Sequence, residues 1–110
     1  MSDKIDTYAA FWPYYLREHS RAATRNLHYF GTALGLLLLL LAIVLGIWWL
    51  VLVAIVSGYL FAWIGHMAVE RNRPATFTYP VWSLVSDFRM FFLWCGGRLD
   101  GELQKAGVTS

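Results

Sequence analysis

The stretch that decides the fold runs from Gly31 to Met67 and reads GTALGLLLLLLAIVLGIWWLVLVAIVSGYLFAWIGHM. None of its 37 positions carries Asp, Glu, Lys or Arg. As one helix it would extend about 55 Å at about 1.5 Å per residue, whereas the hydrocarbon core of a bilayer is only about 30 Å thick. The run therefore predicts two transmembrane helices that fold back on each other, at about residues 27–46 and 49–69.

The composition agrees with a small membrane protein. Hydrophobic residues make up 58% of the 110 residues and charged residues only 15%, which is an unusual apolar excess for a soluble globule. The length allows one domain, residues 1–110. A net charge of +2 is too small to suggest a nucleic-acid partner, so membrane lipids are the expected surroundings. The sequence leaves an oligomer open.

Basic residues on both sides of the run predict its orientation. They are Arg17, Arg21 and Arg25 before the first span, and Arg71 and Arg73 after the second. The turn between the spans carries no charge. By the positive-inside rule, the N-terminus and the loop at 70–80 face the cytoplasm. We therefore expect an integral membrane protein, in a bacterium an inner-membrane protein.

The flanking segments predict further helices. Residues 3–24 read as amphipathic N-terminal helices, the second of which begins at Pro13, because proline suits the first turn of a helix. Residues 81–97 read as an interfacial or re-entrant helix, because a charge such as Asp87 is costly in lipid. The polar tail at 98–110 is expected to be frayed. The predicted fold class is all-α, an integral membrane helical hairpin with flanking amphipathic and interfacial helices.

The three histidines lie on three different segments of this predicted fold. His19 precedes the hairpin, His28 begins the first span and His66 lies near the end of the second. His66 and Glu70 are four residues apart and share one helical face. A bend within residues 20–24 would fold His19 back toward the other two. The sequence therefore predicts a cluster of three imidazoles and one carboxylate at the cytoplasmic edge of the membrane.

Imidazole and carboxylate donors without thiolate suit iron(II), manganese or zinc. A single interfacial histidine is more often a hydrogen-bonded polar residue, and His66 could pair simply with Glu70. Arg25 or Arg71 could bind a substrate carboxylate, or could serve only to set topology and contact lipid head groups. Tyr15 could reach such a site by a hydrogen bond.

Small residues predict where the two spans touch. Gly31 and Gly35 form a GxxxG spacing, and small residues let membrane helices approach closely. With a turn near residues 48 and 49, Gly31 lies opposite His66 and Gly35 lies opposite Ala62. The helices would then be in contact near the polar cluster.

Two blocks of this chain, YYLREHSRAATRNLHYFGT (14–32) and GHMAVERNRPATF (65–77), resemble the motif blocks of the 2-hydroxy fatty acid dioxygenase family. The resemblance implies a membrane enzyme with non-haem Fe(II) as its cofactor. Its partners would be O2 and a long-chain 2-hydroxy fatty acid, which it shortens by one carbon in α-oxidation.

The resemblance also suggests roles for individual residues. His19, His28 and His66 match the family's histidines and are the expected metal ligands, while Glu70 matches the glutamate of the second block and is the expected catalytic residue. Family members often carry Glu near the position of Asp87. Two other classes stay open at this point, a haem-binding membrane protein and a non-catalytic protein that interacts with lipids.

Overall fold

The structure, a computed structural model, describes residues 4–108, and this range is all-helical as predicted. The α-helices are α1 (Tyr8–Arg17), α2 (Ala22–Leu45), α3 (Trp49–Ile64), α4 (Pro80–Cys95) and α5 (Leu99–Ala106). A π-helical segment, η1 (Gly65–Glu70), continues α3, and a 3-10 turn, η2 (Ala75–Phe77), precedes α4. Asp3, where the N-terminal helices are predicted to begin, lies outside the described residues.

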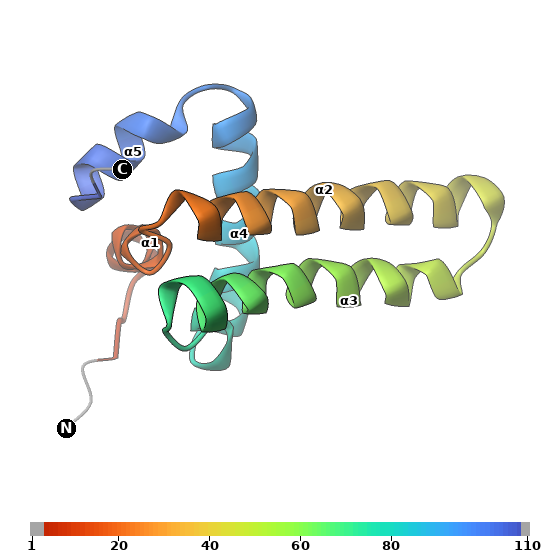
Figure 1. The fold of residues 1–110 in the computed structure, drawn as a ribbon, viewed down its shortest axis with the longest axis horizontal. Coiled ribbons are helices and arrows are strands. Elements are labelled where there is room, and N and C mark those ends of the chain that lie inside the picture. The colour runs from red at the N-terminus through yellow and green to blue at the C-terminus, as the bar shows by residue number, and fades with distance from the viewer. Residues whose placement is uncertain (1–3, 109–110) are drawn as a thin grey trace.

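Helices α2 and α3 lie side by side and run in opposite directions (Figure 1). Gly46 ends α2 in the left-handed conformation, with φ of 67°, where a side chain would be strained. A Cβ atom at Gly31 would lie 3.0 Å from Phe61 Cβ, and one at Gly35 would lie 3.1 Å from the carbonyl oxygen of Ala54. These two glycines therefore allow the helices to pack closely, as small residues do between membrane helices.

The predicted register of this helix pair is wrong. Gly31 lies beside the backbone of Gly58 rather than opposite His66, and Gly35 lies beside Ala54 rather than Ala62. The turn begins already after Leu45, so each residue of α2 meets a part of α3 that is nearer the turn. Hydropathy locates an apolar run well but does not fix the residue at which the chain reverses.

The N-terminal segment differs from its prediction at Pro13, which lies inside α1 instead of starting a new helix. The helix begins earlier because Thr7 Oγ1 accepts a hydrogen bond from the Ala10 N–H at 3.2 Å, which is an N-cap. Phe11, Trp12, Tyr15 and Leu16 are all buried. This burial offsets the local cost of proline. The bend predicted within residues 20–24 lies slightly earlier, between α1 and α2 at residues 18–21, because α2 already begins at Ala22.

The C-terminal tail forms a helix, whereas we expected it to be frayed. Leu99, Leu103 and Ala106 are buried on one face of α5, a spacing typical of an amphipathic helix. Trp12 Nε1 of α1 donates a hydrogen bond to Glu102 Oε1 at 2.8 Å. Helices α1, α4 and α5 thus gather at the open end of the α2–α3 pair, with α4 running across it (Figure 1).

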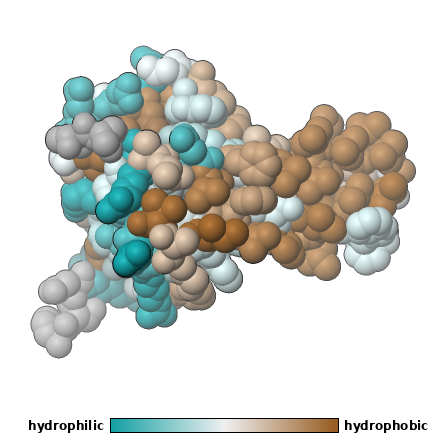
Figure 2. All heavy atoms as spheres, in the orientation of Figure 1, coloured by the Kyte–Doolittle hydropathy of each residue, from teal (hydrophilic) through white to brown (hydrophobic). Residues whose placement is uncertain are grey.

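The other end of the α2–α3 pair is apolar and largely uncovered, as Figure 2 shows. Ile43, Val44 and Leu52 are 72%, 69% and 64% exposed. Two helical stretches, Ala22–Leu45 and Trp49–Glu70, are long and apolar enough to cross a membrane, and only 22% of each apolar window is buried within the protein. A core helix of a soluble protein would be mostly buried instead.

Candidate metal centre

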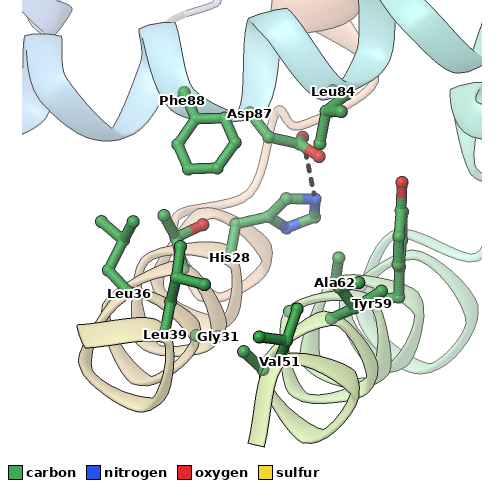
Figure 3. A pocket seen from close by; sticks show the side chains of 15 residues that line it. His28, Gly31, Leu36, Leu39, Val51, Tyr59, Ala62, Leu84, Asp87 and Phe88 are labelled. Atoms are coloured by element: carbon green, nitrogen blue, oxygen red, sulfur yellow. Dashed lines mark ion pairs between the residues drawn. The ribbon is translucent and has the colours of Figure 1, made fainter. Parts of the chain in front are cut away.

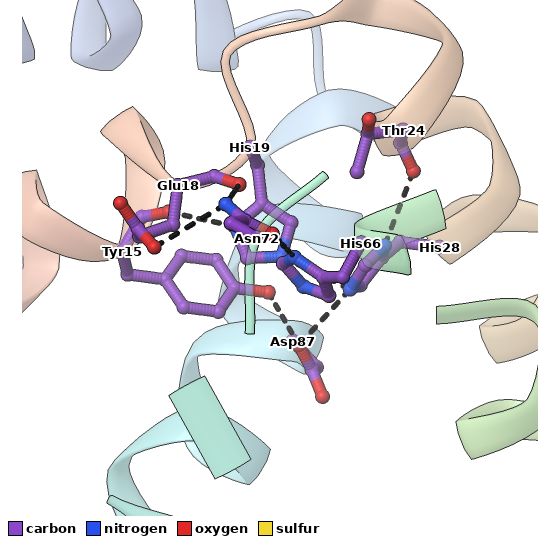
Figure 4. A network of polar contacts seen from close by, with 8 residues as sticks. All are labelled: Tyr15, Glu18, His19, Thr24, His28, His66, Asn72 and Asp87. Atoms are coloured by element: carbon purple, nitrogen blue, oxygen red, sulfur yellow. Dashed lines mark hydrogen bonds and ion pairs between the residues drawn. The ribbon is translucent and has the colours of Figure 1, made fainter. Parts of the chain in front are cut away.

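The structure brings the three histidines together at the open end of the helix pair (Figure 4). His19 follows α1, His28 lies in α2 and His66 lies in η1. One ring nitrogen of each lies within 4.8 Å of the others, and all three residues are buried. The Nε2 atoms of His19 and His28 are only 3.0 Å apart. Residues that are far apart in the sequence therefore form one compact group of nitrogens.

Each histidine uses its Nδ1 atom to bond an oxygen that can only accept. The three bonds join His19 Nδ1 to Tyr15 O (2.6 Å), His28 Nδ1 to Thr24 O (3.1 Å) and His66 Nδ1 to Asn72 Oδ1 (2.7 Å). Because a carbonyl oxygen has no hydrogen to give, each Nδ1 must carry the proton. In the neutral imidazole the Nε2 atom then carries a free lone pair.

Asn72 is itself oriented by Glu18. Its Nδ2 atom donates to the Glu18 carbonyl oxygen at 3.0 Å and to Glu18 Oε1 at 3.2 Å. Since only the amide NH2 group can donate to these acceptors, Oδ1 must be the atom that faces His66. The Asn72 amide that orients the His66 ring is therefore itself oriented by Glu18, the residue before His19.

Three lone pairs converging in a buried space call for a cation. Two Nε2 lone pairs at 3.0 Å repel each other unless a proton or a metal ion lies between them. Two nitrogens bound at right angles to one divalent ion, each about 2.1 Å away, would be about 3.0 Å apart. Burial holds the pKa of His19 well below its ordinary value, so its ring is neutral and free to bind a metal. The donor set fits Fe(II), Mn(II) or Zn(II).

Local backbone features place His66 in this group. The π-helical segment η1 interrupts the α-helix at this residue, and π-helical insertions are frequent at functional sites. A Cβ atom at Gly65 would lie 3.1 Å from Thr24 Cγ2, so glycine lets η1 approach α2 next to His28. Arg71 then ends the segment with φ of 61°, which turns the chain back and brings Asn72 under the His66 ring.

Asp87 of α4 is the carboxylate that faces the histidines. Its Oδ1 atom lies 4.0 Å from His28 Nε2 and accepts a hydrogen bond from the Tyr15 hydroxyl. Burial raises the pKa of Asp87 to about 7, although the Tyr15 hydrogen bond opposes this shift. The sequence places two charged residues, Asp87 and Arg89, in this apolar helix, and by itself it favours Asp87 as a satisfied polar residue slightly over a partner that holds a histidine ring. The geometry of Asp87 favours the second interpretation.

Glu70 lies outside the group of three histidines. Its carboxylate accepts hydrogen bonds from Ser20 Oγ at 3.0 Å and from the backbone N–H of Arg21, just before α2. It thus supports the start of α2, where backbone N–H groups lack helical partners. The predicted four-residue cluster contains its three imidazoles but not this carboxylate, and the catalytic role of Glu70 stays a prediction.

The three residues predicted to bind substrate lie in different surroundings. Arg25 is buried, and its Nη1 atom donates to the carbonyl oxygens of His19 at 2.7 Å and Ser20 at 2.9 Å. It therefore stabilises the bend that carries His19. Arg71 is exposed at the end of η1. Tyr15 is buried and lines the space between the histidines.

Two cavities meet at this centre. A space of about 10 Å³ lies between the three histidines, and Trp63 and Ser83 also line it. Trp63 Nε1 and Ser83 Oγ are buried without a hydrogen-bond partner in the described part of the chain. A larger cavity of about 160 Å³ begins at His28 and Asp87 and follows α2 and α3 (Figure 3). Sequence reasoning missed Trp63, Ser83 and Asn72, because no local pattern distinguishes them.

Comparison with known proteins assigns the family. The model of one family, described as 2-hydroxy-palmitic acid dioxygenase Mpo1-like, matches residues 5–99. No curated protein and no solved structure matches the chain. The matched range includes every histidine of the candidate metal centre, together with Asn72 and Asp87. The chain therefore belongs to the 2-hydroxy-palmitic acid dioxygenase Mpo1-like family.

Proposed function

We propose that this protein is an Fe(II)-dependent membrane dioxygenase that shortens a long-chain 2-hydroxy fatty acid by one carbon. The observation that carries the proposal is the convergence of three buried imidazoles, each with its Nδ1 atom bonded to a carbonyl oxygen. The description of the family, 2-hydroxy-palmitic acid dioxygenase, suggests the reaction class and the substrate class.

The atoms balance with O2 as the sole oxidant. One 2-hydroxy acid and one O2 give the acid one carbon shorter, one CO2 and one water. The C1–C2 bond breaks and C2 becomes the new carboxyl carbon, so that C2 loses three electrons and C1 loses one. These four electrons reduce O2.

His19, His28 and His66 would hold the iron through their Nε2 atoms. Bound Fe(II) supplies Lewis-acid binding of substrate oxygens and the capacity to activate O2. The protein's part is to keep the rings neutral and oriented, and hydrogen bonds from ligand Nδ1–H groups to fixed acceptors do this. The space of about 10 Å³ between the rings is too small for a porphyrin, which favours non-haem iron over the haem-binding alternative.

Residues around the small cavity would bind the polar end of the substrate. Trp63 Nε1 and Ser83 Oγ are buried donors without a partner in the described residues, and each can donate to the substrate carboxylate. Asp87 can accept a hydrogen bond from the 2-hydroxyl group, with Tyr15 holding its carboxylate in place. Arg71, exposed at the end of η1, would attract the carboxylate as it approaches.

The α2–α3 pair would cross the membrane as a hairpin. Its uncovered end is apolar (Figure 2), and exposed apolar surface of this extent marks contact with lipid or protein. Helix α4 would lie in the interface, because it crosses the base of the hairpin and exposes Val81, Val85 and Phe92. The metal centre would then sit at the inner edge of the bilayer, where the carboxyl end of a lipid-dissolved fatty acid lies.

Oxygen consumption by the detergent-purified, iron-loaded protein tests this function. We expect iron-dependent O2 uptake with 2-hydroxyhexadecanoate, formation of pentadecanoate, and no uptake with unhydroxylated hexadecanoate. His66→Ala should lose both iron and uptake, whereas Met67→Ala, at the exposed neighbouring position (62% exposed), should keep both. A folded protein that retains iron but consumes no O2 with 2-hydroxy acids of any chain length would refute the activity.

A further inference from the structure

A groove between α2, α3 and α4 opens directly onto the candidate metal centre (Figure 3). Its volume is about 160 Å³. It shares four lining residues with the small cavity between the histidines, namely His28, Tyr59, Ala62 and Asp87. The two spaces are therefore neighbours with a common wall, and a molecule in the groove can present one end to the histidines.

The groove exists because small residues line the facing surfaces of the hairpin. Gly31, Gly35 and Ala54 line it from the hairpin, and Leu84 and Phe88 line it from α4. Apart from its end at His28 and Asp87, the lining is almost entirely apolar. An apolar cavity of about 150 Å³ stays dry and binds benzene. The space therefore suits about six carbon atoms of a hydrocarbon rather than water.

We propose that this groove, which we call the acyl groove, binds the first methylene groups of the fatty acid substrate. The inference rests on the proposed function, because it takes the carboxyl end to lie at His28. The remainder of the chain would leave the groove at Leu39 and Val51, which are 38% and 36% exposed on the apolar end of the hairpin. The acyl groove would thus make the enzyme selective for long chains and keep them aligned with the histidines.

Two neighbouring residues of α3 offer a matched test. Ile55 and Val56 are 53% and 55% exposed, but only Ile55 lines the acyl groove. Ile55 lies one helical turn, about 5 to 6 Å, beyond Tyr59, which borders the histidine cavity. Tryptophan at position 55 would fill the groove beyond the reach of a short substrate such as 2-hydroxybutyrate.

We expect Ile55→Trp to lower kcat/KM for 2-hydroxyhexadecanoate by at least about tenfold, the factor lost when roughly two methylenes lose their burial. The same variant should change kcat/KM for 2-hydroxybutyrate less than about twofold, as should Val56→Trp for either substrate. The acyl groove would be refuted if Ile55→Trp lowered kcat/KM equally for 2-hydroxyhexadecanoate and 2-hydroxybutyrate. It would also be refuted if Ile55→Trp and Val56→Trp lowered kcat/KM for 2-hydroxyhexadecanoate equally.

Photocrosslinking of the wild-type protein gives a second readout that needs neither turnover nor a variant. A 2-hydroxyhexadecanoate probe with a diazirine near its sixth carbon should label groove residues such as Leu36, Leu84 and Phe88, and excess unlabelled substrate should prevent it. Labels confined to Leu52 or Ile43, on the uncovered surface, would contradict the inference. Groove labelling without O2 uptake would refute the proposed function alone, whereas O2 uptake without groove labelling would refute the acyl groove alone.

Discussion

Asn72 is the residue through which the assignment of the metal centre can be tested most directly. Its Oδ1 atom accepts the proton of His66 Nδ1 at 2.7 Å, and two bonds to Glu18 prevent the amide from flipping. Asn72→Ala would leave His66 free to rotate and to carry its proton on Nε2, the atom that should bind iron. Loss of such an outer partner typically lowers metal affinity 10- to 100-fold.

This change corresponds to about 1.4 to 2.8 kcal/mol of binding free energy. We expect Asn72→Asp to keep affinity close to wild type, because a carboxylate oxygen still accepts the Nδ1 proton. Asn72→Asp should nevertheless lower stability, since it loses the two donors to Glu18 and places two carboxylates side by side. Comparison of the wild type with Asn72→Ala and Asn72→Asp therefore separates the role of Asn72 as a hydrogen-bond acceptor from its role as a donor.

The assay is competition for Fe(II) against a chelator of known affinity, under anaerobic conditions and with bound iron counted per chain. Asn26→Ala is the matched control, because Asn26 is exposed on α2. Wild-type affinity in folded Asn72→Ala would show that His66 is not oriented through this amide. Equal loss in Asn72→Ala and Asn72→Asp would show that the acceptor oxygen is not what matters.

Three further predictions follow from contacts around the centre. Tyr15→Phe removes the hydrogen bond to Asp87, whose side chain is 20% exposed, and should lower the free energy of unfolding by about 1 to 3 kcal/mol. Thermal unfolding in detergent measures this loss, and an unchanged melting temperature would contradict it. Gly31→Ala should destabilise the helix pair by about 1 to 3 kcal/mol, because its Cβ would lie 3.0 Å from the Phe61 side chain. At Gly58 the nearest atom of the facing helix would be 4.0 Å from the new Cβ, so that Gly58→Ala should be tolerated. Glu70→Gln should retain iron and lose about 1 kcal/mol of stability as a weakened cap of α2; a large fall in kcat with unchanged stability would instead support a catalytic role.

The parts of the fold that could be predicted from the sequence are those governed by local composition. A run without charges identifies helices that pass the length and hydropathy test for a membrane, because burying a charge in lipid is costly. The three histidines could be named as one site because the predicted reversal of the chain brings their segments to the same end. Helix α5 was missed although Leu99, Leu103 and Ala106 follow a helical period, because polar residues dominate the mean hydropathy of this segment.

The partner of His66 could not be predicted, because it depends on a turn rather than on a helix, unlike the i−4 carbonyl partners of His19 and His28. Asn72 reaches His66 only after η1 widens the helix and Arg71 adopts a left-handed conformation. Neither event has a sequence signal, since Arg71 is not a residue that favours positive φ. A regular α-helix continued through residues 65–72 would separate the His66 ring from this amide by more than one turn.

The tertiary fold also explains why Asp87, and not the predicted Glu70, is the carboxylate that faces the histidines. A spacing of four residues places Glu70 on the same helical face as His66 but about one turn further along the axis. At that depth its carboxylate accepts hydrogen bonds from the backbone N–H of Arg21 and from Ser20 Oγ, at the start of α2, where a negative charge is favoured. The position beside His28 is thereby left to a residue from another element, and α4 supplies Asp87 by crossing the base of the hairpin. The loop at 71–79 sets where α4 crosses the hairpin. The tertiary fold therefore determines whether Glu70 or Asp87 faces the histidines, and the spacing of residues in the sequence does not reveal it.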